Sequence, residues 1–217
     1  PSNVIRISNC AFENNMSDFL GGGALAMSGG GTLTVEYCTF TNNAVVADPS
    51  SGSGTGGAIS IDYYSSGSVP VSGNATVSNC VFSNNTVTAG FATSGGAIGL
   101  RASHSAQSPA FYTKIEKNRF VNNSAGPSTS GGEGGAIAVS SSFPVDIQYN
   151  SFSGNTIDAG VKEALSIRKF GDGAVTATNN WWSCNTNPQA DGTCSERARI
   201  IGTVGGGTLA TSPWLML

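Results

Sequence analysis

The residues of this chain that could do chemistry are few, and an acid–base pair is the closest to a cluster. Asp62 and Arg101 follow apolar stretches at the same interval, so we expect them to be neighbours on adjacent structural repeats. A polysaccharide lyase needs carboxylates around a metal ion and a basic residue, and a glycoside hydrolase needs carboxylates within about 5–10 Å of each other. No second acid stands at a position equivalent to Asp62. We therefore favour a surface ion pair over an acid–base site.

His104 is the only histidine, and it lies in a polar loop. Histidine titrates near neutrality without help from its surroundings, so it is the natural candidate for proton transfer. No partner for it is evident, and with 30 serines in the chain a Ser–His–acid arrangement cannot be told from chance. We interpret His104 as a solvated loop residue. The sequence predicts no catalytic residue, no metal site and no cofactor.

Aromatic side chains in loops give a better functional lead. They follow the apolar stretches of successive repeats: Tyr63, Tyr64, Phe111, Tyr112 and Phe143, with His104 beside them. If they gather at one corner they form a ridge that binds sugars or protein partners by ring stacking and apolar burial. The alternative is that the rings fold back and cover their own loops.

Two alternating motifs reveal the repeat that positions these residues. The first, Gly-Gly-Ala-(Ile/Leu), begins at Gly22, Gly56, Gly95 and Gly134, with a degenerate copy at 162–165. The second is Phe-x-x-Asn, and its aromatic residues are Phe12, Phe40, Phe82, Phe120, Phe152 and, in a variant copy, Trp182. Variable spacing around fixed motifs indicates a constant structural unit with loops of different length.

Apolar residues alternate on both sides of the motifs, which is the period of a β-strand. After each Gly-Gly-Ala the alternation leaves small outward residues: Ala26, Ser60, Gly99, Ala138 and Ser166. The next outward position reads Ser28, Asp62, Arg101, Ser140 and Arg168. No helical period is present. Short strands that recur about every 30 residues cannot bury an apolar face alone, so they must stack.

Stacking in register places like residues on like residues. It predicts ladders of Phe, of Ile and of a third position that reads Cys10, Cys38, Cys80, Asn118, Asn150 and Asn180. Parallel crossovers are almost always right-handed. The sequence therefore predicts an all-β fold, a single-stranded, right-handed parallel β-helix of about six coils with a C-terminal cap.

The alternation of Gly-Gly-Ala-(Ile/Leu) with Phe-x-x-Asn over residues 9–185 resembles the passenger repeats of chlamydial polymorphic membrane proteins. That resemblance implies a surface-exposed β-helical adhesin exported as an autotransporter passenger at the outer membrane. The ending, 179–185 followed by 212–215, looks like the closing coil of β-helix domains in large extracellular proteins of environmental bacteria.

The five cysteines fall into two groups. Cys10, Cys38 and Cys80 occupy equivalent positions, and we expect buried, reduced thiols there, since in-register side chains suit disulfide torsions poorly. Cys184 and Cys194 flank a polar loop, and a disulfide between them is expected, with zinc as the alternative. A disulfide indicates an oxidising, extracellular compartment.

We divide the chain into a β-helix repeat domain, 1–185, and a disulfide loop with capping strands, 186–217. Trp181, Trp182 and Trp214 are interpreted as residues that cover the C-terminal end, because a solenoid end exposes strand edges and rings. The chain opens directly on a strand-like segment without a signal peptide. We expect it to be cut from a longer solenoid with flanking domains.

Composition narrows the function. Gly, Ser, Thr and Asn make up 98 of 217 residues, charged residues 11%, and the net charge is −3. The lack of a basic patch argues against nucleic-acid binding, and no apolar run is long enough to span a membrane. We expect a non-enzymatic bacterial cell-surface or secreted adhesin-like segment, a display scaffold or spacer that binds a receptor or glycan of a host or environmental surface. The alternative is a carbohydrate-active β-helix: a lyase, a hydrolase or a glycan-binding module.

Overall fold

The structure is a computed structural model that describes most of the chain. The described residues are 3–18, 21–48, 52–63, 73–89, 92–102, 111–126, 132–157, 166–184, 194, 196, 198–200 and 207–215. They contain strands and no helix, and so no helix long and apolar enough to cross a membrane.

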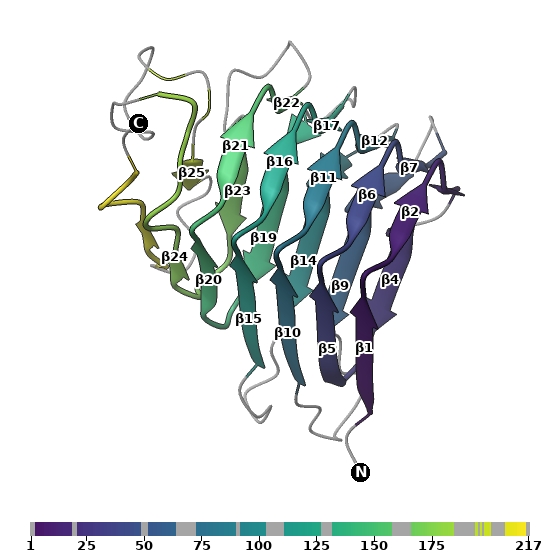
Figure 1. Cartoon of the computed structure of the whole chain (residues 1–217), viewed down its shortest axis with the longest axis horizontal. Coiled ribbons are helices and arrows are strands. Elements are labelled where there is room, and N and C mark those ends of the chain that lie inside the picture. Colours follow the sequence, from purple (N-terminus) through teal and green to yellow (C-terminus); the bar gives the residue numbers. More distant parts are fainter. Residues whose placement is uncertain are drawn as a thin grey trace.

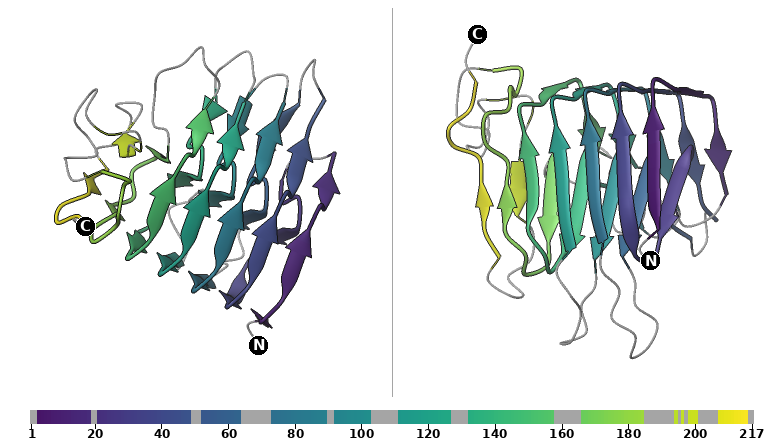
Figure 2. Two further views of the ribbon diagram at one scale, coloured as in Figure 1. Left: turned by 45° about the horizontal axis from the view of Figure 1, so that its top comes forward. Right: turned by 60° about the horizontal axis from the view of Figure 1, so that its bottom comes forward.

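The chain winds through five parallel sheets, which we letter A to E in the order that each coil visits them (Figure 1). The second coil illustrates the course: β5 (Gly31–Glu36), β6 (Thr39–Thr41), β7 (Ala44–Val46), β8 (Ser53–Thr55) and β9 (Ile59–Tyr63). The next strand, β10 (Gly73–Ser78), returns to sheet A beside β5. Figure 2 shows the coils side by side from the first (purple) to the last (yellow).

The remaining strands extend these sheets. Sheet A adds β1 (Val4–Ser8), β15 (Phe111–Glu116), β20 (Val145–Gln148), β24 (Val175–Thr176) and β26 (Leu209–Ala210). Sheet B adds β2 (Ala11–Glu13), β11 (Val81–Ser83), β16 (Arg119–Val121) and β21 (Ser151–Ser153). Sheet C adds β3 (Met16–Ser17), β12 (Thr86–Thr88), β17 (Ser124–Ala125) and β22 (Thr156–Ile157). Sheet D adds β13 (Ala92–Ser94) and β18 (Gly132–Glu133), and sheet E adds β4 (Leu25–Ser28), β14 (Ile98–Ala102), β19 (Ile137–Ser141), β23 (Ile167–Phe170) and β25 (Ala198–Ile200). This arrangement confirms the predicted parallel β-helix of about six coils.

The Gly-Gly pair of the first motif is required by backbone geometry. Gly56 has φ +65°, and a Cβ there would lie 2.0 Å from the carbonyl oxygen of Ile59. At Gly57 a Cβ would lie 2.2 Å from the carbonyl oxygen of Gly96 in the next coil. The first glycine thus allows a left-handed turn, and the second allows adjacent coils to approach each other.

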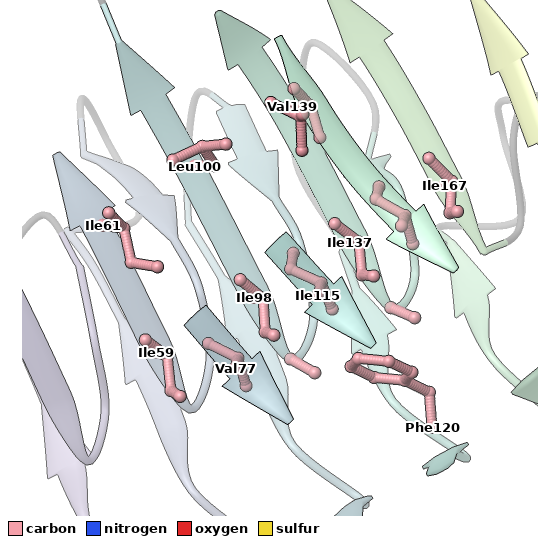
Figure 3. Packing of buried hydrophobic residues seen from close by; sticks show 14 of the residues in the cluster. Ile59, Ile61, Val77, Ile98, Leu100, Ile115, Phe120, Ile137, Val139 and Ile167 are labelled. Atoms are coloured by element: carbon pink, nitrogen blue, oxygen red, sulfur yellow. The ribbon is translucent and has the colours of Figure 1, made fainter. Parts of the chain in front are cut away.

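Identical apolar side chains stack along the interior. Phe40 pairs with Phe82 at a ring-centroid distance of 4.9 Å, and the aromatic column continues from Phe12 to Trp182, which lies 4.8 Å from Phe152. Opposite it, Ile59, Ile98 and Ile137 from sheet E form a second column (Figure 3). The ladders predicted from the motifs are confirmed.

Two polar ladders mark the turns on either side of sheet B. At the A–B turn, the Asn118 side chain donates to Asn150 Oδ1 at 3.1 Å, and Asn150 donates to Asn180 Oδ1 at 3.1 Å. At the B–C turn, Asn85 donates to Asn123 Oδ1 at 2.9 Å. All these amides are buried. Asn85, Asn118 and Asn150 donate to their counterparts in the next coil, and Asn180 donates to the carbonyl oxygen of Ile147 at 2.6 Å, as buried polar groups require.

The end of the second ladder was not anticipated. The variant sixth copy of Phe-x-x-Asn predicts that Asn185 follows Asn155 in this ladder, but Asn185 lies outside the described residues. Glu196 accepts the backbone N–H of Asn155 at 3.0 Å and its side-chain amide at 3.3 Å, and Ser166 Oγ also donates to it. Glu196 is 1% exposed, and burial raises the pKa of its carboxyl group. A carboxylate therefore terminates a ladder of amides.

The fifth Gly-Gly-Ala copy was aligned incorrectly. Ile137 pairs with Ile167, two residues later than the copy at 162–165 implies. Arg168 consequently stands beside Ala138 on the outward face, where Ser166 was expected, and Phe170 stands beside Ser140, where Arg168 was expected. Lys169 takes the interior position of Val139 and donates its Nζ to the carbonyl oxygen of Gly171 at 2.7 Å.

The cysteines behave as expected except that Cys10, on the first coil, is exposed rather than buried. Cys184 and Cys194 form a disulfide, and Cys10, Cys38 and Cys80 are free thiols, the last two buried. Burial raises the pKa of Cys80 to about 12, so this thiol stays protonated near neutrality. At the C-terminal end Trp182 is fully buried, and Trp214 packs against the core, in keeping with a capping role.

Phe82→Ala tests the aromatic column. Phe82 is fully buried between two stacked rings, so its truncation is expected to lower the free energy of unfolding by about 3–5 kcal/mol. Urea denaturation measures the change. Tyr37→Asn, which alters an exposed side chain, is the control and should stay within about 0.5 kcal/mol. Equal effects of the two variants would contradict the column's role in stability.

The buried carboxyl of Glu196 makes stability depend on pH. Because its pKa is raised in the folded state, the folded chain binds more protons than the unfolded chain above the ordinary pKa of 4.5. The free energy of unfolding should therefore fall as the pH rises from 4.5 toward the raised pKa. Measured against Glu196→Gln over this range, the wild-type chain should show the steeper fall. Parallel curves would show that Glu196 does not titrate as proposed.

Candidate functional site

The aromatic ridge predicted from the loops is largely buried. Tyr63 and Phe111 are 0% and 2% exposed and stack at a centroid distance of 4.5 Å. Phe143 meets Phe111 edge-on at 4.9 Å and packs against the core. The exposure expected of Tyr63 and Phe111 is thus wrong, and the alternative, rings that cover their own corner, is what these residues show. The reason is that they continue the interior alternation by one further step.

Tyr112 is the ridge residue that remains accessible among those described. It is 39% exposed, and its hydroxyl donates to Asp146 on the next coil, which raises the pKa of Tyr112 to about 12. Tyr64 and His104 lie outside the described residues. The ridge therefore reduces to one exposed phenol that is held by a carboxylate.

Asp62 and Arg101 are neighbours, as predicted. They are directly paired in the register of β9 and β14. Between these two described side chains there is no ion pair, so the expected surface salt bridge is not formed. Glu36 and Glu116 lie on the two strands that flank β10 in sheet A, and each is paired in register with Ser78. The two acids are therefore two coils apart.

Arg101 instead borders a groove of about 540 Å³ on the outer side of sheets D and E. The residues that shape it are Thr55, Ser94, Gly99, Arg101, Ser140 and Phe170. The small outward residues of β14 and β19 form its floor, and sheet D forms a wall, since a Cβ on Gly99 would lie 2.1 Å from Thr55 Cγ2. The small ladder noted in the sequence thus lets sheet D pack closely on sheet E, and the groove follows their junction.

Phe170 gives this groove an aromatic surface. The ring also packs against Arg168, whose guanidinium carbon lies 4.4 Å from the ring centroid. Phe170 was missed in the sequence because the degenerate fifth repeat was read two residues out of register. Phe170 lies two coils from Arg101 and three coils from Asp62, since β14 and β19 both stand between β9 and β23.

The chemistry available in this groove is recognition. Hydroxyls of Thr55, Ser94 and Ser140 can exchange hydrogen bonds with a polar ligand, Arg101 can bind a carboxylate or hydroxyl, and Phe170 can stack on a sugar ring. No carboxylate belongs to the described lining. Over the described part of the chain, no group of three or more His, Cys, Asp or Glu residues is arranged to hold a metal ion.

Variants of Tyr63 test whether this ring is a buried structural residue or an exposed binding residue. Its hydroxyl is buried beside Thr113 without a hydrogen bond of good geometry among the described residues, and burial raises its pKa. Tyr63→Ala should lower the free energy of unfolding by about 3–5 kcal/mol. Tyr63→Phe should change it by less than about 1 kcal/mol, because it removes only an unsatisfied polar group. Thermal or urea unfolding measures both. A fully stable Tyr63→Ala would restore the exposed-ridge interpretation.

Comparison with known proteins agrees with this architecture. Residues 2–188 match the family model described as a right handed beta helix region. The searches of curated proteins and of solved structures returned no match. Since the matched residues include all but the first residue and the last 29 of the 217, and their coils are those of a parallel β-helix, the chain belongs to the right-handed β-helix family.

Proposed function

We propose that this chain is a non-enzymatic, adhesin-like segment of a bacterial surface or secreted protein, a rigid scaffold that presents a glycan-binding groove. The groove on sheets D and E carries this proposal, because it combines hydroxyls, Arg101 and the Phe170 ring over a backbone fixed by stacked coils. Such a mixture of a few polar groups and an aromatic surface is common in ligand sites.

Two further observations support an extracellular setting. The Cys184–Cys194 disulfide is of a kind that persists in oxidising compartments. The repeat motifs resemble those of chlamydial polymorphic membrane protein passengers, which are surface adhesins. The proposed partner is accordingly a glycan or receptor on a host or environmental surface, reached in the context of a longer surface protein.

The carbohydrate-active alternative uses Asp62 and Arg101 on the same face. It is favoured by their direct pairing in register and by the position of Arg101 on the groove. This alternative requires chain cleavage, whereas the adhesin-like function requires retention only, so one experiment distinguishes them.

The test is incubation of the purified chain with a panel of neutral and charged polysaccharides, with both retention and chain length measured. We expect retention without cleavage. Arg101→Ser, which installs the residue found at this position in the next coil, should weaken retention about tenfold through loss of the guanidinium contacts. Arg6→Ser, on sheet A, is the matched control and should leave retention unchanged.

Two outcomes would contradict the proposal. Cleavage that is lost in Asp62→Asn would support the enzyme alternative. Retention of the neutral polysaccharides that is insensitive to Arg101→Ser would remove the groove on sheets D and E from the binding surface, and no retention at all would favour a spacer.

A further inference from the structure

A second groove lies elsewhere on the molecule and was not anticipated from the sequence. It also measures about 540 Å³ and follows the turn between sheets A and B, across the third to sixth coils. In Figure 1 this turn lies between β15 and β16 and continues between β20 and β21. The side chains on which the argument depends are Asn79, Lys117, Arg119, Tyr149, Ser151 and Trp181.

Lys117 and Arg119 make this groove positive. Both side chains are exposed. Glu116, the adjacent acid in the chain, pairs with Lys114 at 2.8 Å and is thereby engaged on sheet A. Among the described residues, no carboxylate pairs with Lys117 or Arg119, and none lines the groove. Two uncompensated cations on one short stretch favour an anionic ligand.

Tyr149 is placed where folding gives no reason for an aromatic residue. Its φ is +58°, in the left-handed region; three equivalent residues, Asn9, Asn79 and Asn179, are of the type that tolerates this conformation, and a fourth, outside the groove, is Tyr37. The ring is nevertheless 51% exposed. Tyr37 is exposed at the same turn position, so what distinguishes Tyr149 is its place in the groove beside Lys117 and Arg119.

Trp181 lies one coil beyond Ser151 on the same outward ladder as Arg119. The groove therefore offers two cations and two rings on rigid, neighbouring coils. An extended peptide cannot add as a strand here, because β16 is already paired on both edges, with β11 and β21. A polymer of rings that carry anionic groups satisfies both the cations and the aromatic faces.

We propose that the groove at the A–B turn is a binding site for an anionic polysaccharide, with Lys117 and Arg119 contacting its carboxylates or sulfates and Tyr149 and Trp181 stacking on its sugar rings. The site is separate from the groove on sheets D and E and does not depend on it.

The test measures affinity of the intact chain for four immobilised probes: polygalacturonate, dextran sulfate, neutral dextran and poly-L-glutamate. We expect binding of one or both anionic polysaccharides that weakens as salt is raised, and little binding of neutral dextran. The two anionic probes distinguish carboxylate from sulfate as the preferred group. Poly-L-glutamate tests the alternative of an acidic peptide.

The variants use residues that the repeat itself supplies. Lys117→Asn combined with Arg119→Thr, which installs the residues of equivalent coils at Asn79 and Thr39, should weaken binding at least about tenfold. Tyr149→Asn should weaken it about fivefold to tenfold without loss of stability. Tyr37→Asn makes the same change at an equivalent, 58% exposed tyrosine outside the groove and should have no effect.

The proposal is overturned if neither anionic polysaccharide binds, if poly-L-glutamate binds as tightly as they do, or if Tyr149→Asn and Tyr37→Asn behave alike. Arg101→Ser, on the other groove, should leave this binding unchanged. Sensitivity to Arg101→Ser alone would assign the ligand to sheets D and E and overturn the second site while leaving the proposed function in place.

Discussion

The structure depends on one constraint: each side chain in the interior must pack against its counterpart one strand spacing away. The ring-centroid distances along the aromatic column, 4.8 to 5.1 Å, are close to the distance of about 4.8 Å between hydrogen-bonded strands. At that spacing a flat ring stacks best on another flat ring, and an amide hydrogen-bonds best with another amide. The backbone ladder and the side-chain ladders therefore reinforce each other, and a change in one coil affects both neighbours.

The same constraint makes the ends of the solenoid special, because the last member of each ladder has no copy to follow it. The aromatic column ends on Trp182, a larger ring, and the amide ladder at the B–C turn ends on Glu196. The Glu196 carboxylate accepts the two hydrogen bonds from Asn155 that the side-chain oxygen of an Asn would accept. Unlike an Asn, it has no N–H group that would need an acceptor in a further coil. The carboxylate is buried at an electrostatic cost, visible in its raised pKa, and in exchange leaves no amide unsatisfied.

The interior could be predicted from the sequence because stacking requires the same residue types at equivalent positions of successive coils. Phe, Asn, Cys and the Gly-Gly pair recur, and their register follows directly from their alignment. Prediction failed where the repeated residue types change. Other residues replace the glycines in the fifth repeat, so the predicted register of β23 was wrong by two residues, and Phe170 was not recognised as an outward residue. The corner rings Tyr63 and Phe111 were misjudged because they lie beside loops, although their positions continue the interior alternation. Neither groove could be predicted, since each is lined by outward positions whose residue types change from coil to coil.

The outward positions are where this fold can acquire function, because stacking restricts the interior but leaves the surface free to vary. At the A–B turn the backbone conformation suits Asn, and three coils carry it, whereas Tyr37, Lys117 and Tyr149 depart from the residue that the turn favours. A departure on one coil would be an isolated substitution. Departures on adjacent coils, together with Arg119 and Trp181 on the next outward ladder, produce a row of groups spaced by the coil repeat. A surface built with such a period is suited to a ligand that is itself a regular polymer, because one repeat unit of the ligand can meet one or two coils of the protein.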